Sequence, residues 1–198
     1  MSSENSRISE TKMIIEPHRP KMKEKFFFLL SGIIVSVPIT LFAQSLAGSL
    51  GSVSSIFESA AFSAVVLAPV IEEFAKAYPL VYRHGETERS IFTLGFLVGL
   101  GFGISELVIY TLVLQAFVPA RLLAVFFHGC SASITVYGIA NKRPLPFYLF
   151  AVFLHFSNNF LAIFAPDTWF LGSPLIAIFT YFIAWTLYNR TTKKFTET

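Results

Sequence analysis

Residues 90–115 read SIFTLGFLVGLGFGISELVIYTLVLQ and contain one charged side chain, Glu106. A helix needs about 20 apolar residues to cross roughly 30 Å of hydrocarbon, and this stretch is longer than that. Gly95, Gly99 and Gly103 are spaced four apart, which favours close approach of a second helix in a membrane. The stretch therefore predicts a transmembrane helix packed tightly against a neighbour.

Similar apolar blocks lie on both sides of this stretch. Of the 198 residues, 54% are hydrophobic and 14% are charged, whereas a soluble domain carries about 25% charged residues. The further blocks fall at about 26–50, 58–82, 120–140, 145–165 and 170–189. The sequence therefore predicts an all-α polytopic membrane helix bundle with six transmembrane helices.

Polar segments flank the predicted bundle at 26–190. Residues 1–25 are charged and interrupted by proline, which is typical of a polar tail. They do not form a secretory signal, and the first apolar block is long enough to remain as an anchor. Residues 191–198 form a second short tail. Cys130 is the single cysteine, so no intrachain disulfide is possible.

Lysine and arginine occur in alternate connections between the blocks. They precede the first block, separate the second from the third and the fourth from the fifth, and follow the sixth. The remaining connections, 51–57, 115–120 and 166–169, contain neither residue. Because positive charge marks cytoplasmic connections, we expect an integral cell-membrane protein with both termini in the cytoplasm. No basic patch suited to nucleic acid is evident.

Four of the blocks contain ionisable or amide side chains well inside their apolar length. These are Glu72, Glu73, Lys76, Glu106, His128, His155, Asn158 and Asn159. Each charged group near the bilayer centre costs about 2.5–3.5 kcal/mol, so three carboxylates and one ammonium cost ~10 kcal/mol before pairing. We therefore expect these groups to face one another or a water-filled cavity.

Glu72 and Glu73 are adjacent, and neighbouring residues on a helix point about 100° apart. Both carboxylates therefore cannot face the same water equally. Lys76 lies within helical reach of either carboxylate and is expected to stabilise one of them as an ion pair. Pro69 lies in the same block and, like Pro38 in the first block, lacks an N–H, so it frees a backbone carbonyl one turn earlier.

Two other classes of function explain parts of this pattern. Chains of Glu and His also relay protons in transporters, but the inverted repeat expected of such a protein is not visible. A non-catalytic scaffold or partner-binding bundle would use the same residues as ion pairs and interhelical hydrogen bonds. In that interpretation Lys76, His128 and Asn159 are structural, and Tyr110 anchors the helix at the membrane interface.

Taken in chain order, the polar residues form four motifs. EExxK is followed by FxxxExxxY, by Arg and His seven apart, and by HxxxN. The corresponding positions are Glu72 to Lys76, then Phe102, Glu106 and Tyr110, then Arg121 and His128, then His155 and Asn159. This ordered set, over about residues 60–165, resembles the PrsW family of intramembrane proteases, relatives of the type II CAAX prenyl endopeptidases.

The resemblance implies a hydrolase that cleaves a peptide bond in or next to the membrane. It also implies single-pass membrane proteins, such as anti-sigma factors, as substrates. In the CAAX relatives a glutamate activates water without a metal, and a His/Asn pair holds the oxyanion. On this pattern Glu72 and Glu73 supply the base, and His155 and Asn159 are the oxyanion donors.

The resemblance leaves other members of the candidate site without a fixed role. Glu106 and His128 belong to the catalytic set, whereas Lys76, Tyr110 and Arg121 support it. Following the relatives, we expect no required cofactor.

Zinc is the alternative, because two His and a Glu can bind zinc while another Glu acts as base. The candidate zinc ligands are Glu72, Glu106, His128 and His155. The sequence does not predict the oligomeric state.

Overall fold

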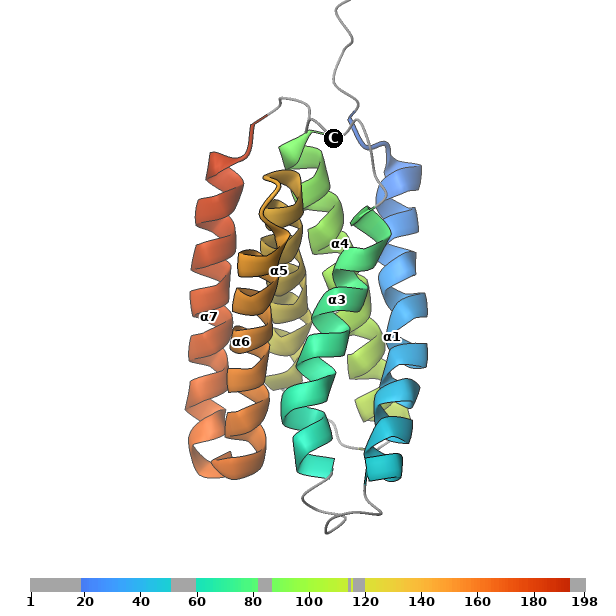
Figure 1. The fold of residues 1–198 in the computed structure, drawn as a ribbon, viewed down its shortest axis with the longest axis vertical. Helices are drawn as coiled ribbons and strands as arrows, with labels where there is room; N and C mark the ends of the chain where they lie inside the picture. The colour runs from blue at the N-terminus through green and yellow to red at the C-terminus, as the bar shows by residue number, and fades with distance from the viewer. Residues whose placement is uncertain (1–18, 51–59, 82–86, 114, 116–119, 193–198) are drawn as a thin grey trace, which may run out of the picture.

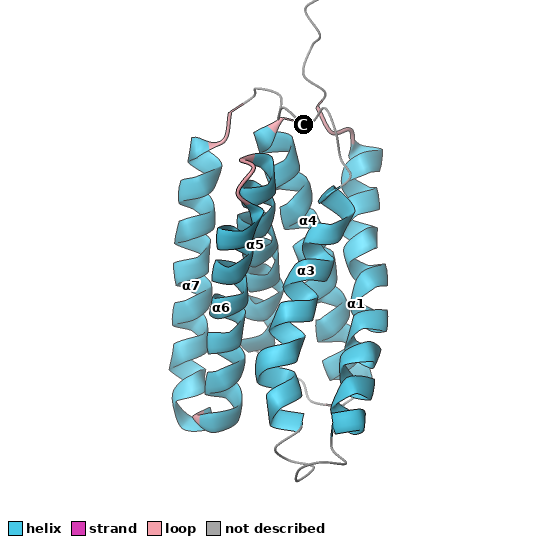
Figure 2. Cartoon of the chain, viewed as in Figure 1, coloured by secondary structure: helices cyan, strands magenta, loops and turns pink. Residues whose placement is uncertain are grey.

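The computed structural model describes residues 19–50, 60–81, 87–113, 115 and 120–192. These residues form helices joined by short connections, and no strand occurs among them (Figure 2). The all-α prediction is therefore confirmed. The elements are α1 (Met22–Leu50), η1 (Ser63–Leu67), α3 (Ala68–Val81), α4 (Glu88–Val108), η2 (Ile109–Val113), α5 (Ala120–Ala140), α6 (Pro144–Phe164) and α7 (Pro166–Arg190).

The helices stand side by side along the long axis of the bundle (Figure 1). In that view α3 and α6 lie in front of α4 and α5, with α1 and α7 on the two flanks. Helix α4 contacts α1 and α5, while α5 also contacts α6 and α7. The beginning of α1 and the end of α7 lie at the same end of the bundle. Which side of the membrane this end faces stays a prediction.

Five of the helices are long and apolar enough to cross a membrane. They cover Met22–Leu46, Glu88–Val113, Arg121–Ala140, Pro144–Phe164 and Pro166–Arg190. Residues 60–81 form a further continuous helical run through η1 and α3. That run contains the charged residues of the EExxK motif and is not among the five, so the count of six spans stays a prediction.

The boundaries of two predicted blocks differ from the observed helices. Helix α1 begins at Met22, before the start of the predicted first block. The expected connection at 166–169 is wrong, because α7 begins at Pro166 and only Ala165 separates it from α6. Proline is favoured in the first turn of a helix, and the acidic Asp167 suits the same turn. The predicted connection at 51–57 lies outside the described residues.

The glycines of α4 bring its backbone against α5, as their spacing predicts. A Cβ atom on Gly99 would overlap the carbonyl group of His128, and one on Gly103 would overlap the backbone of Val125. One on Gly95 would overlap a side chain of α5 in the same way. This close approach holds the segment of α5 that carries His128 directly against α4.

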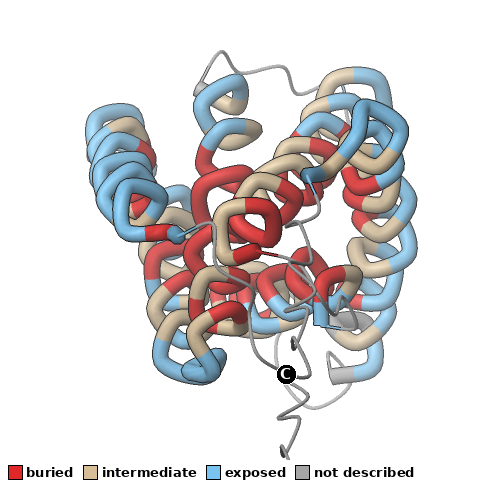
Figure 3. The backbone as a smooth tube through the Cα atoms, turned by 90° about the horizontal axis from the view of Figure 1, so that it is seen from above, coloured by how far each residue is buried: buried red, intermediate tan, exposed pale blue. Residues whose placement is uncertain are grey.

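Burial follows the membrane setting of the helices. Buried residues gather where the helices face one another, and the outward faces are exposed (Figure 3). Large apolar side chains such as Phe74, Phe153 and Trp185 are exposed on these outward faces, as expected for surfaces that contact lipid. By contrast, Glu73, Lys76 and His128 are buried inside the bundle.

Candidate active site

The structure brings together the polar residues that the sequence distributes over four blocks. Glu72, Glu73 and Lys76 lie on α3, and Glu106 lies near the end of α4. His128 lies on α5, and His155 and Asn159 lie on α6. Contacts join all of these side chains except Asn159 into one connected cluster, as their cost in a membrane led us to expect.

Glu73 and Lys76 form the fully buried centre of the cluster. The Lys76 Nζ atom donates to Glu73 Oε1 at 2.5 Å, and both side chains are 0% exposed. Ser131 on α5 accepts from Lys76 at 3.2 Å and lies 3.1 Å from Glu73 Oε1. Helical spacing allowed Lys76 to pair with either carboxylate. In the structure it pairs with Glu73 and not with Glu72.

His128 connects this pair to Glu106. The Lys76 ammonium is 3.0 Å from His128 Nδ1. Because an ammonium can only donate, Nδ1 is the acceptor and the ring proton lies on Nε2. His128 Nε2 then donates to Glu106 Oε2 at 2.7 Å. The ring of Phe102 covers the cluster from one side, with its centroid 5.2 Å from Lys76 Nζ.

His155 lies between the two adjacent carboxylates of α3. Its Nδ1 atom is a donor to Glu73 Oε1 at 2.9 Å, so Nε2 carries the lone pair. That Nε2 atom lies 3.7 Å from Glu72 Oε2. Glu72 Oε2 is buried without a hydrogen-bond partner among the described residues. Glu73 thus orients His155, and the free nitrogen of His155 faces the free oxygen of Glu72.

A cavity of about 300 Å³ adjoins the cluster. Glu72 lines this cavity, whereas Glu73 and Lys76 lie behind its wall. The adjacent carboxylates therefore face different surroundings, as their angular separation on the helix requires. The predicted site residues that line the cavity are Glu72, Glu106, Tyr110, Arg121, His128, His155 and Asn159.

Asn159 binds a carbonyl group that the preceding helix leaves free. In the π-helical turn η1, the Ala68 N–H bonds to Ser63 O, five residues back. The next donor in that register would be residue 69, which is proline and has no N–H. The Ala64 carbonyl therefore lacks that helical donor, and Asn159 Nδ2 donates to it at 2.9 Å. The carbonyl that Pro69 was expected to free is used to orient Asn159.

Several residues of the site escaped the sequence analysis. Ser131 lies three residues after His128 on the same face of α5, so helical spacing alone could have found it. Trp169 and Ser173 of α7 line the cavity, but α7 carries no motif. Tyr148 of α6 donates to the Val70 carbonyl of α3 at 2.8 Å, and nothing in the sequence marks that contact.

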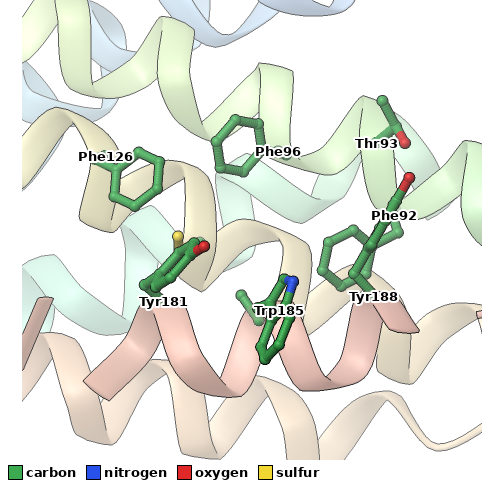
Figure 4. A pocket seen from close by; sticks show the side chains of 9 residues that line it. Phe92, Thr93, Phe96, Phe126, Tyr181, Trp185 and Tyr188 are labelled. Atoms are coloured by element: carbon green, nitrogen blue, oxygen red, sulfur yellow. The ribbon is translucent and has the colours of Figure 1, made fainter. Parts of the chain in front are cut away.

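A second cavity, of about 320 Å³, lies between α4, α5 and α7 (Figure 4). Aromatic side chains dominate its lining, including Phe92, Phe126, Tyr181 and Trp185. It contains no carboxylate and no histidine. Hydrolytic chemistry therefore belongs to the first cavity and not to this one. Cys130 also lines it and is a free, buried thiol packed in the apolar core.

Comparison with known proteins identifies the family. The family model described as PrsW family intramembrane metalloprotease matches residues 23–187. The chain belongs to the PrsW family. It is therefore an integral multi-pass membrane peptidase that acts on a membrane protein substrate. No curated protein and no solved structure matches the chain.

The PrsW-family description includes a metal, and the cluster contains a suitable donor set. Glu72, His128 and His155 each offer a ligand atom, and these atoms lie within 4.8 Å of one another. Zinc takes such imidazole and carboxylate ligands, and Glu72 Oε2 is a buried oxygen without a partner. Because His128 Nδ1 accepts from Lys76 and Nε2 carries the ring proton, His128 would have to give up that proton to bind an ion through Nε2. The zinc alternative therefore fits the cluster, and the expectation of no required cofactor is not confirmed.

Proposed function

We propose that this protein hydrolyses a peptide bond in or next to the membrane-spanning segment of single-pass membrane proteins, with Glu72 at the reacting water. One observation carries the proposal. Glu72 and Glu73 each have an Oε2 atom that is buried without a partner among the described residues, but of the two only Glu72 lines the cavity. A carboxylate free to accept a proton beside a cavity is what general-base chemistry needs.

Glu73 and Lys76 position the groups that contact substrate. The Lys76 ammonium neutralises Glu73 at 2.5 Å, and Glu73 Oε1 holds the Nδ1 proton of His155 at 2.9 Å. A carboxylate bonded to one imidazole nitrogen fixes the tautomer and presents the other nitrogen to the site. His155 Nε2 is thereby directed toward Glu72 and the cavity.

Asn159 supplies the donor for the oxyanion that forms as water attacks the peptide carbonyl. One amide hydrogen is bound to the Ala64 carbonyl, and the second remains for a substrate oxygen in the cavity that Asn159 lines. A donor that is already oriented stabilises developing charge at little reorganisation cost. Asn159 is thus an oxyanion donor, as the family resemblance implies.

A divalent ion such as zinc would be held by Glu72, His128 and His155, and it would supply Lewis-acid polarisation of the peptide carbonyl. Glu106 then remains as the carboxylate that takes the proton from water. Its side chain is 24% exposed, against 11% for Glu72, and it lines the same cavity. Without an ion, Glu72 itself takes that proton.

The test is cleavage of candidate single-pass proteins from the same genome by purified protein in liposomes. Glu72→Gln keeps the volume of the side chain and should reduce turnover by about 10³-fold. Asp167→Asn removes an exposed carboxylate at the start of α7 and should leave turnover unchanged. Near wild-type turnover by Glu72→Gln would reject its assignment.

The zinc content of the same variants distinguishes the metal-dependent reaction from the metal-free one. We expect about one zinc per chain in the wild type, in line with a single set of ligands. Glu72→Gln should lose the zinc, whereas Glu106→Gln should keep it and lose turnover. Full activity after exhaustive chelation, with little zinc bound, would leave Glu72 as the base and exclude the metal route.

We also propose that residues 1–25 and 191–198 are cytoplasmic tails, because lysine and arginine alternate between the connections. The turn between α5 and α6 should then face the cytoplasm, and the start of α7 should face outward. In a Cys130→Ala background, a membrane-impermeant thiol reagent applied to intact cells should label Thr168→Cys and spare Lys142→Cys. The reverse pattern would overturn the orientation.

A further inference from the structure

One end of the cavity is built from residues whose only polar side-chain atoms are donors or hydroxyl groups. Arg121 comes from the first turn of α5, Trp169 from the first turns of α7, and Tyr110 from η2. All of them line the cavity that also contains Glu72 and His155. The guanidinium carbon of Arg121 lies 3.2 Å from the centroid of the Tyr110 ring. This stacking fixes the plane of the guanidinium group.

Two N–H groups at this end have no hydrogen-bond partner. The Arg121 Nε and Trp169 Nε1 atoms are both buried, and neither has an acceptor among the described residues. Buried donors normally have partners, because an unmade hydrogen bond costs the full desolvation of the group. Two such donors on one cavity wall indicate a binding site for an oxygen acceptor.

The charge of Arg121 narrows the class of acceptor. Within the described part of the chain, Arg121 forms no direct ion pair, and it interacts with Glu106 of the same cavity only at longer range. Lys76, by contrast, is paired directly with Glu73 at 2.5 Å. A cation inside a membrane protein needs an opposite charge or several acceptors. A guanidinium group also matches a carboxylate better than a single carbonyl, because it can donate twice in parallel.

We propose that Arg121 and Trp169 form a substrate subsite that binds an oxygen acceptor of the substrate, and that the preferred acceptor is the carboxylate of an Asp or Glu beside the scissile bond. The proposal rests on the proposed protease function and deepens it. The subsite shares its cavity with Glu72, so one extended peptide reaches both. It directs the acidic residue of the substrate toward the end of the bundle where α5 and α7 begin (Figure 1).

The tryptophan content of the chain offers a direct binding signal. The sequence contains two tryptophans, Trp169 and Trp185, and Trp185 lines the separate apolar cavity of Figure 4. In a Trp185→Phe background, the emission of Trp169 reports the subsite alone. Adding Glu72→Gln prevents cleavage, so binding is measured without turnover.

The probes are two synthetic peptides, each an apolar membrane-spanning segment followed by Ala-Asp-Ala or by Ala-Asn-Ala. The Asp peptide should change the Trp169 emission and should bind about tenfold more tightly than the Asn peptide, because its acceptor is charged. Arg121→Gln should remove this difference. Arg143→Gln is the matched control, because Arg143 is exposed at the start of α6, and it should keep the difference.

Trp169→Phe keeps an aromatic ring and removes only the indole donor. With a fluorescently labelled Asp peptide as the readout, this variant should bind several-fold more weakly, because a hydrogen bond to a charged acceptor is lost. Thermal unfolding of each variant shows whether the bundle remains folded. Arg121→Lys provides a second variant that keeps the charge and loses the paired donors, and it should bind the Asp peptide with intermediate affinity.

Equal binding of both peptides, weakened alike by Arg121→Gln and Trp169→Phe, would support the subsite with a main-chain carbonyl as its acceptor. Unchanged Trp169 emission, together with full binding to Arg121→Gln, would overturn the proposal. Because these measurements use the Glu72→Gln background, failure of the wild type to cleave any substrate would reject the protease function without changing the binding result.

Discussion

Two helix contacts hold the bundle together in different ways. One is the α4–α5 interface, and the other is the contact of α6 with η1 and α3, which we call the α3–α6 seam. Along α4, glycines replace side chains, so backbone meets backbone and a Cβ on Gly99 would overlap the carbonyl of His128. Along the seam, α6 contacts the α3 side through three hydrogen bonds. Their donors are Tyr148, His155 and Asn159, and their acceptors are the Val70 carbonyl, Glu73 and the Ala64 carbonyl.

Side chains beside the seam leave unfilled space, in contrast to the close backbone packing of α4 and α5. An apolar cavity of about 340 Å³ near Tyr148 is lined by residues of α3, α5 and α6, and one of about 330 Å³ near Phe160 is lined by η1, the residues just before it and α6. In a membrane, close approach of small residues gains dispersion energy along the whole interface. Isolated hydrogen bonds instead fix the orientation of individual side chains at a few points along the contact. The comparison indicates that α4–α5 supplies rigidity, while the seam sets the orientation of the reactive groups.

The largest effect should come from breaking the centre of the seam. Glu73→Gln leaves the fully buried Lys76 ammonium without its counter-ion, which costs about 3–5 kcal/mol. We expect both a lower unfolding temperature and a large loss of turnover. Glu72→Gln should lose turnover with no such drop in stability, because Glu72 makes no ion pair with Lys76. Equal stability of the two variants in detergent would contradict the assignment of Glu73 as the structural partner.

The α4–α5 interface can be broken separately. Gly99→Ala places a methyl group against the backbone of α5, and overpacking of this kind costs about 1–3 kcal/mol. Gly172→Ala is the matched control, because its Cβ would meet only the flexible side chain of Leu161. Thermal unfolding should fall for Gly99→Ala and change little for Gly172→Ala. A similar fall for both would mean that close backbone approach does not distinguish α4.

The hydrogen bond from Asn159 to the Ala64 carbonyl tests the orienting role of the seam, because its loss should change side-chain orientation more than stability. Pro69→Ala restores an N–H that competes for the Ala64 carbonyl, and alanine favours a helix. We expect unchanged or higher stability with about tenfold lower kcat, since the oxyanion donor is no longer oriented. KM should change little.

A double-mutant cycle tests whether this effect passes through Asn159. In an Asn159→Ala background, Pro69→Ala should cause no further loss of kcat, because the two residues share one interaction. Additive losses would show that Pro69 acts through the general shape of the helix. The same cycle in unfolding temperature reports the hydrogen bond even if no substrate is cleaved.

The smallest effect should follow Tyr148→Phe at the edge of the seam. This change removes one hydrogen bond to the Val70 carbonyl and keeps the ring. The expected loss is about 1 kcal/mol of stability and a change of a few-fold in turnover. Tyr181→Phe, in the separate apolar cavity of Figure 4, is the control and should leave both quantities unchanged. A loss from Tyr148→Phe as large as that from Glu73→Gln would show that the seam depends on all its contacts equally.

The sequence by itself determined the helical architecture and identified the ionisable members of the polar cluster, although not Ser131. Apolar length predicts spanning helices, and the cost of charge in lipid requires Glu73, Lys76 and His128 to meet inside the bundle. The spacing of Gly95, Gly99 and Gly103 predicted a close helix contact for the same local reason. These inferences need only periodicity and composition, which act within a single helix.

Only the tertiary structure decided which of these groups face the cavity. The π turn η1 shifts the helix face that follows it by about 100°, because it adds one residue to a turn. The cavity also depends on how α3, α5, α6 and α7 are rotated against one another. Glu72 therefore faces the cavity while Glu73 is buried behind it, and Trp169 joins the site without a motif, because these arrangements depend on contacts between helices rather than on spacing within one.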